Sequence, residues 1–172
     1  MFSRIIKDFF LKKNINKKLT KITEASNDKI KTIGIIIDST YFFDAEKLLT
    51  EIKSKKNDFN EIKVLFFNDK VGHKDSLSQL SFSLRDISLF GKIKVVEVQD
   101  FIAYPFDLLV NFYNEDKPAL SYVSLFSKSK FKVGFTDMNI CIGNHLLIKS
   151  NVKEYKNFVS ELFKYLKILN KI

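Results

Sequence analysis

Polar side chains follow three apolar runs that are predicted to be strands of one sheet. Asp38 ends the run IGIIID, and Ser39 and Thr40 come directly after it. Ligands of open α/β sheets bind beyond the carboxyl ends of the strands, where a carboxylate could bind a hydroxyl group or act as a base. The alternative is that Asp38 caps the helix that follows. The residues predicted to bind a ligand at these strand ends are Asp38, Ser39, Thr40, Asn68, Asn111 and Tyr113.

These strand ends would converge if the strands, numbered along the chain, lie in the order 3-2-1-4-5. The glycine-rich motifs that bind phosphates are missing, because the first turn reads DSTY and neither GxGxxG nor GxxxxGK[ST] occurs. A conventional dinucleotide or P-loop site is therefore not expected. With only two histidines and no nucleophile elbow, a Ser-His-Asp hydrolase is not expected either.

Metal and thiol chemistry has little support in the sequence. His73 lies in a polar loop with Asp69 and Asp75, and these residue types can serve as metal ligands. Because Lys70 and Lys74 flank them, we expect no metal there. His145 begins an apolar segment, so a structural role is favoured. Cys141 is the only cysteine, which excludes a disulfide within the chain and a site with several cysteines. We expect no cofactor.

The N-terminal segment, residues 2–21, has the pattern of a basic amphipathic helix. Its apolar positions recur at helical spacing, and Lys and Arg fill the other positions. Such a helix could pack on the body, lie on a membrane surface or contact nucleic acid. The residues predicted to contact a partner or a membrane are Arg4, Lys7, Phe9, Phe10, Lys12, Lys13, Lys17 and Lys18.

The elements that must position these residues alternate between apolar strands and amphipathic helices. Strands are predicted at 33–38, 62–67, 92–98, 107–111, 130–135 and 145–149, and helices around 42–52, 116–126 and 152–169. Residues 76–90 fit a weak helical stripe or an extended segment. The pattern predicts an α/β fold, a single Rossmann-like three-layer domain with a mostly parallel sheet of about five or six strands. A helical arm is expected at 1–28 and the domain at 29–172.

Charge is concentrated in the arm. Residues 1–31 hold nine Lys or Arg against three Asp or Glu, whereas the remainder holds 20 against 17. No run approaches the roughly 20 apolar residues of a membrane-spanning helix. The N-terminus also lacks the continuous apolar core and cleavage site of a signal peptide. We therefore expect a cytoplasmic protein that is either free or peripheral to a membrane.

The segment FDLLVNFYNEDKPALSYVSLFSKSKFKVGF, residues 106–135, resembles a family of small uncharacterised Bacteroidetes proteins, a domain of unknown function. The basic opening and the segment FGKIK, residues 90–94, are also similar to that family. More distantly, residues 106–135 resemble the N-terminal Rossmann-like half of heptosyltransferase-type GT-B glycosyltransferases. This second resemblance implies a fold, but we do not expect the second domain that holds the nucleotide sugar in that family.

The leading hypothesis is an uncharacterised cytoplasmic α/β protein that acts as a non-catalytic binding or accessory module. It would bind a protein partner or an anionic surface through its arm, or a partner through the polar strand ends. One alternative is a degenerate or partial glycosyltransferase-like enzyme that binds a sugar phosphate or nucleotide sugar around Asp38 and Asn111. A second is a peripheral membrane or RNA-contacting protein that acts through the basic arm, without sequence-specific nucleic-acid recognition.

Overall fold

A parallel sheet forms the middle layer of the molecule. The computed structural model describes residues 2–19, 25–40, 42, 44–55, 58–69, 79–136 and 143–172. Its strands are β1 (Thr32–Asp38), β2 (Glu61–Phe67), β3 (Ser81–Phe82), β4 (Leu108–Phe112), β5 (Phe131–Phe135) and β6 (Leu146–Ile148). They lie in the order β3-β2-β1-β4-β5-β6, and every neighbouring pair is parallel. The predicted mostly parallel sheet of five or six strands is thereby confirmed.

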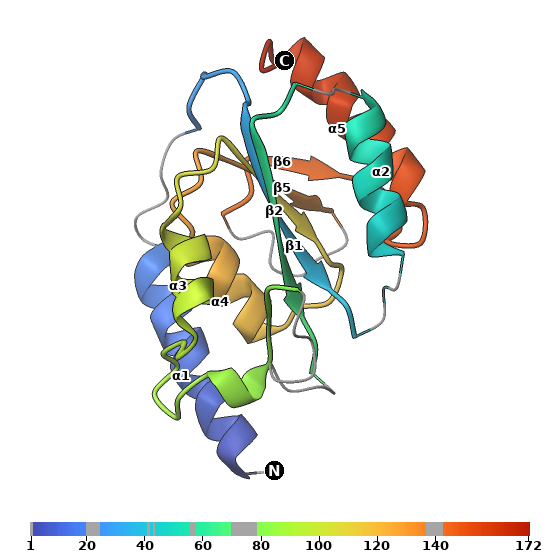
Figure 1. Cartoon of the computed structure of the whole chain (residues 1–172). Coiled ribbons are helices and arrows are strands. Elements are labelled where there is room, and N and C mark those ends of the chain that lie inside the picture. The colour runs from blue at the N-terminus through green and yellow to red at the C-terminus, as the bar shows by residue number, and fades with distance from the viewer. Residues whose placement is uncertain are drawn as a thin grey trace.

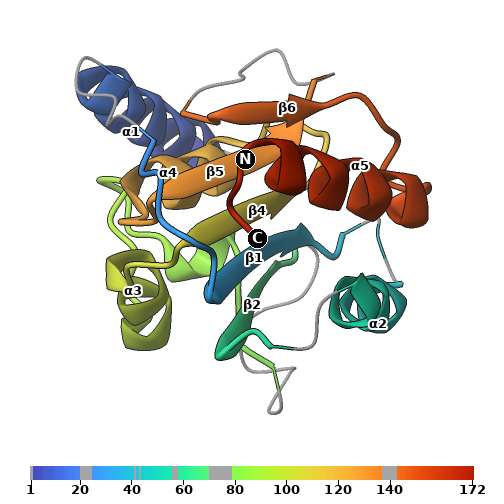
Figure 2. The same ribbon diagram turned by 90° about the horizontal axis from the view of Figure 1, so that it is seen from above.

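Helices cover both faces of the sheet. They are α1 (Phe2–Leu19), α2 (Ala45–Lys55), the short 3-10 helix η2 (Leu84–Asp86), α3 (Val96–Ala103), α4 (Pro118–Phe126) and α5 (Tyr155–Ile168). The helices α2 and α5 lie on one face, and α1, α3 and α4 lie on the other (Figures 1 and 2). This arrangement is the three-layer α/β fold that the sequence predicts.

The apolar run of β1 is continuous because both of its faces are buried. Ile33, Ile35 and Ile37 pack in the cluster beneath α2 and α5, whereas Ile36 packs in the cluster beneath α3 and α4. A strand in the middle of a parallel sheet has no solvent-facing side, so polar residues do not alternate with apolar ones. Asp38 therefore marks the point at which the strand leaves the core.

Gly34 of β1 is required by the close approach of two side chains. A Cβ atom at this position would lie 2.8 Å from Phe106 Cδ2 and 3.0 Å from Leu109 Cδ1. Both neighbours are fully buried, so neither can move into open space. The absence of a side chain at Gly34 thus lets the Phe106 ring rest directly on β1.

The strand predicted at 92–98 is wrong, because α3 begins at Val96. Ile93 makes only an isolated antiparallel bridge to Ile87. Val98 and Phe101 are buried while Val96 is 62% exposed, which is the spacing of a helix with one face on the core. The prediction was wrong because polar and apolar residues alternate in most of KIKVVEV, as they do in a strand. The edge strand is instead β3, which lies inside the ambiguous stretch 76–90.

No helix in the described part of the chain is long and apolar enough to cross a membrane. The separation of an arm at 1–28 from a domain at 29–172 stays a prediction.

We predict that Gly34→Ala destabilises the protein by about 1–3 kcal/mol, because the new methyl group overlaps the Phe106 ring. In an unstrained strand Gly→Ala is mildly stabilising, so a loss of stability here would indicate the overlap with Phe106. Urea unfolding of Gly34→Ala, Phe106→Leu and the double variant measures this effect. The double variant should be less destabilised than the sum of the single variants. Additivity within about 0.5 kcal/mol would contradict the overlap.

Candidate functional sites

Asp38 lies at the carboxyl end of β1, where its carboxylate is engaged by the chain itself. It is 6% exposed. Its Oδ1 accepts a hydrogen bond from the Thr40 N–H at 3.0 Å, and its Oδ2 accepts one from Lys117 Nζ at 2.5 Å. Lys117 immediately precedes α4 and lies over the Phe67 ring at 5.3 Å. Asp38 therefore stabilises its own turn and binds Lys117, and does not cap α2, which begins at Ala45.

Thr40 and Asp69 extend this arrangement toward α1. Thr40 Oγ1 accepts a hydrogen bond from the Asp69 N–H at 3.2 Å and one from Lys117 Nζ at 3.4 Å. Asp69 Oδ2 pairs with the Arg4 guanidinium at 3.0 Å. Asp69 Oδ1 is buried and has no hydrogen-bond partner among the described residues. Asp38, Thr40, Asp69 and Lys117 are here called the strand-end cluster.

Ser39 and Asn68 also lie at this edge of the sheet, as the sequence predicts. The Ser39 hydroxyl and N–H both donate to the Phe67 carbonyl, at 2.9 Å and 2.8 Å. The Asn68 N–H donates to the Phe82 carbonyl at 3.1 Å. Both residues are half-buried. Their hydrogen bonds join the end of β1 to β2 and the end of β2 to β3.

Asn111 and Tyr113 share a face of the sheet with Asp38 but are covered by α4. Asn111 is fully buried, and its Nδ2 donates to Ser124 Oγ at 2.8 Å and to Asn144 Oδ1 at 2.7 Å. Tyr113 is 2% exposed and hydrogen-bonded to Ser124. Burial raises the pKa of the Tyr113 hydroxyl above its ordinary range, and the nearby carboxylates act in the same direction. Both side chains thus lie in a closed network between β4 and α4.

The sequence reasoning missed Lys117, the cation of the strand-end cluster. Its signal is positional, since Lys117 directly precedes Pro118 at the start of α4, and β4 lies next to β1. A basic side chain at that point faces the carboxyl end of β1. A hydroxyl or phosphate ligand could use Lys117 and Thr40, but it would compete with the contact of Lys117 to Asp38 and with those of the Thr40 hydroxyl to Asp69 and Lys117.

Lys132 is a buried lysine with altered acidity. Its Nζ donates to the carbonyls of Ser124 at 2.7 Å and Ser127 at 3.1 Å, at the end of α4. Burial lowers the pKa of Lys132 to about 8, and the positive charge of Lys18 acts in the same direction. These contacts are those of a side chain that caps a helix C-terminus. His145 is structural in a similar way, because its Nδ1 accepts the Lys132 N–H at 2.9 Å.

The inward face of α1 is packed on the body. Leu11 is fully buried in the same cluster as Leu120 and Val123 of α4, and Ile15 is 4% exposed. Lys7 Nζ donates to the Leu84 carbonyl at 2.7 Å, and Lys18 Nζ lies 5.9 Å from the centre of the Phe126 ring. The arm is therefore a docked helix with a fixed orientation.

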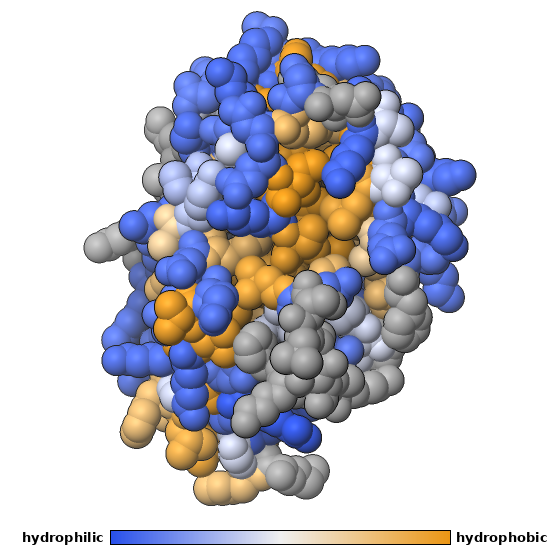
Figure 3. All heavy atoms as spheres, viewed as in Figure 1, coloured by the Kyte–Doolittle hydropathy of each residue, from blue (hydrophilic) through white to orange (hydrophobic). Residues whose placement is uncertain are grey.

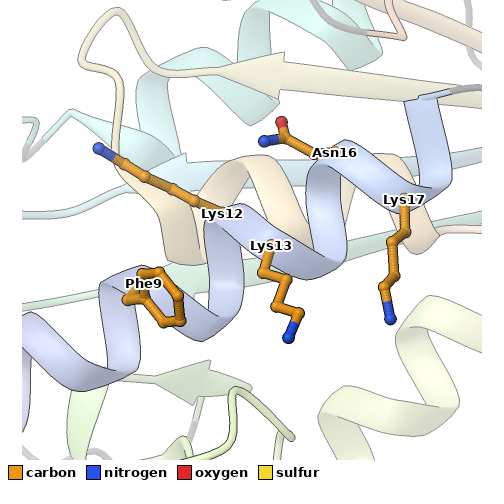
Figure 4. A pocket seen from close by; sticks show the side chains of 5 residues that line it. All are labelled: Phe9, Lys12, Lys13, Asn16 and Lys17. Carbon is orange, nitrogen blue, oxygen red and sulfur yellow. The ribbon is translucent and has the colours of Figure 1, made fainter.

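The outward face of α1 is apolar at its start and basic at its end. With 3.6 residues per turn, one side of the helix carries Phe2, Ile5, Phe9, Lys12, Lys13 and Asn16. Phe2 is 77% exposed, Ile5 63% and Phe9 61%. Figure 4 shows Lys13 and Lys17 on one side of this face, Lys12 and Asn16 on the other, and Phe9 closer to the N-terminus.

The turn after η2 adds two apolar side chains next to α1. Leu89 is 47% exposed and Phe90 66%, and the Phe90 ring meets Phe10 edge-on at 5.4 Å. Gly91 allows this approach, because its φ is +74° and a Cβ there would lie 3.2 Å from the Leu11 nitrogen. Figure 3 shows a group of apolar side chains at the lower end of the molecule, where α1 begins, and a larger apolar area in the middle of the same face. The α1 outer surface is defined here as Phe2, Ile5, Phe9, Lys12, Lys13, Asn16, Lys17, Leu89 and Phe90.

The structure divides the eight arm residues that the sequence predicts as contacts. Phe9, Lys12, Lys13 and Lys17 belong to the α1 outer surface. The other four contact the body: Arg4 pairs with Asp69, Lys7 with the Leu84 carbonyl, Phe10 with Phe90, and Lys18 with Phe126. Phe2 and Ile5 are exposed, whereas Ile15 is buried against the body, so the apolar positions of α1 do not all lie on its inward face.

Within the described residues, no group of three or more His, Cys, Asp or Glu side chains could hold a metal ion. His73, Asp75 and Cys141 lie outside the described residues.

The chain belongs to the DUF6913 family, a family of unknown function, whose model matches residues 7–169. The match begins inside α1 and ends one residue after α5, so it includes the buried residues Leu11 and Ile15 together with the whole sheet. No curated protein matches the chain. The matched residues include the strand-end cluster and the α1 outer surface from Phe9 onward, and the family assigns an activity to neither.

We predict that Lys132 makes stability rise with pH above about 8. Between pH 8 and the unfolded value of 10.5, the unfolded chain binds more protons at Lys132 than the folded chain, so deprotonation favours folding. The free energy of unfolding, measured by urea denaturation, should rise by about 2–3 kcal/mol from pH 7 to pH 10 relative to Lys132→Met. Lys153→Met controls for removal of a surface lysine. Parallel pH curves for the wild type and Lys132→Met would contradict the prediction.

Proposed function

We propose that the protein is a non-catalytic binding module whose contact surface is the α1 outer surface. The observation that supports this proposal is the cluster of exposed apolar side chains at the start of α1 and in the turn after η2. Exposed apolar patches that are bordered by polar residues mark interaction sites. Lys12 and Lys13 adjoin the patch, so an anionic partner is favoured.

The way α1 is held also supports this proposal. Leu11 and Ile15 fix the rotation of the helix, and the Arg4–Asp69 and Lys7–Leu84 contacts hold its first half. The exposed residues are therefore presented in one arrangement before any partner arrives. A preformed surface loses less conformational entropy on binding than a flexible arm does.

We predict that a photo-crosslinking amino acid at position 9 captures a partner in cells. Phe9 is 61% exposed and central to the proposed surface, so a bound partner lies within reach of the probe. Position 168 on α5 is the matched control, because Ile168 is 67% exposed but lies on the opposite face of the sheet. Mass spectrometry of the adducts is the measurement. Adducts at position 9 that are missing at position 168 support the proposal, whereas no adduct or the same adducts at both positions refute it.

A second candidate function is binding of a sugar phosphate or nucleotide sugar at the strand-end cluster. It is favoured by the position of Asp38 at the end of β1 and of Lys117 at the start of α4, which follows the adjacent strand β4. The order of the strands reverses at this point, where open α/β sheets bind ligands. The resemblance of residues 106–135 to glycosyltransferases of the GT-B type suggests the ligand class. Lys117 would contact the phosphate, and Thr40 a phosphate oxygen or a hydroxyl group.

For this second candidate we predict that glucose 1-phosphate or UDP-glucose raises the melting temperature by about 5 °C at a concentration near 100 times Kd. Differential scanning fluorimetry measures the shift. Lys117→Met removes the phosphate contact and should abolish it. Lys117→Arg keeps the charge next to Asp38 and is the control for folding. An unchanged melting temperature with both ligands would exclude the candidate.

A further inference from the structure

We propose that the α1 outer surface binds the surface of an anionic lipid bilayer, an inference that rests on the proposed binding function. The apolar side chains at the start of α1 would enter the headgroup region, and the lysines of the following turns would contact anionic headgroups. The molecule would attach through one side of a helix and through the turn that packs against it.

The apolar part of the surface lies where a bilayer could reach it. In Figure 1 the first turns of α1 extend beyond the body at the lower end of the molecule. Phe2, Ile5 and Phe9 are all more than 60% exposed there, and Phe90 beside them is 66% exposed. Phenylalanine and aliphatic side chains on one side of a helix, with lysines nearby, are typical of helices that lie in the membrane interface.

The charge of the surface is complementary to anionic headgroups. Lys12 and Lys13 lie one turn after Phe9, one on each side of the outward face, and both are exposed. The only acidic residue of α1, Asp8, lies on the flank of this face, 4.0 Å from Arg4. The apolar and basic parts of the surface therefore follow one another along the helix, so both can touch the same plane.

The composition of the surface favours a lipid over a protein or RNA. Protein–protein interfaces are depleted in lysine relative to the rest of the surface, whereas the exposed Lys12 and Lys13 belong to this one. Phenylalanine rings can stack on the bases of single-stranded RNA, but the aliphatic side chains of Ile5 and Leu89 have no flat face for stacking. Aliphatic and aromatic side chains enter lipid equally well, so lipid accounts for all of the exposed groups.

Co-sedimentation of the full chain with vesicles tests this inference. We expect binding to phosphatidylserine-containing vesicles at low salt, and little binding at high salt or to pure phosphatidylcholine. Lys12→Gln with Lys13→Gln should weaken binding about 30-fold, because each lysine near an anionic bilayer contributes about a factor of five. Phe9→Ser with Phe90→Ser should weaken it about 10-fold or more.

Matched variants on the opposite helix separate a specific face from general charge and apolarity. Lys153→Gln with Lys156→Gln and Ile168→Ser with Leu169→Ser change exposed residues near and in α5, and both should bind like the wild type. Circular dichroism confirms that each variant is folded. Equal loss in the two sets of variants, or no binding to the anionic vesicles, would overturn the lipid inference.

Crosslinking from position 9 distinguishes failure of the lipid inference from failure of the proposed binding function. A phospholipid adduct supports both. A protein or RNA adduct without vesicle binding would refute the lipid inference but would support the α1 outer surface as a binding surface. No adduct and no vesicle binding overturn both.

Discussion

The packing of Leu11 and Ile15 against the body sets the orientation of α1, and the exposed surface of that helix depends on it. These two side chains turn one side of α1 toward α4, and the opposite side must then face solvent. Burial of a leucine or an isoleucine contributes about 2 kcal/mol, which is enough to hold a helix that also has the Arg4–Asp69 pair. The exposure of Phe2, Ile5 and Phe9 follows from this orientation.

The two candidate sites are connected through the same helix. Arg4 of α1 holds Asp69, the Asp69 N–H donates to Thr40, and Thr40 lies beside Lys117 and Asp38. The strand ends that commonly hold a ligand in this fold are occupied here by interactions within the chain. Buried charges need such partners, because an unpaired one is costly. The α1 outer surface, in contrast, presents apolar side chains that are 47–77% exposed.

The sequence predicts the strands better than it predicts the sites. The run from Ile33 to Asp38 identifies β1 because a strand buried on both faces leaves no polar position. Polar and apolar residues alternate in most of 92–98, as they do in a strand. The segment from Val96 is nevertheless a helix, α3, whose residues Val98 and Phe101 pack on the core. Asn111 was expected at an open strand end, yet α4 covers it, and periodicity does not reveal which helix covers which strand. Ile5 and Ile15 are residues of the same type, so the sequence pattern does not reveal which of them faces solvent.

The most direct test of this account is hydrogen–deuterium exchange of the free protein. If α1 is a docked helix, the amides of Leu11, Asn14 and Ile15 should exchange slowly, with protection comparable to that of Leu120 and Val123 in α4. The first turn, around Ile5, should exchange faster because it extends beyond the body. Exchange of the Leu11–Ile15 amides at the rate of an unstructured peptide, while α4 stays protected, would show that α1 is a detached arm and would contradict the account.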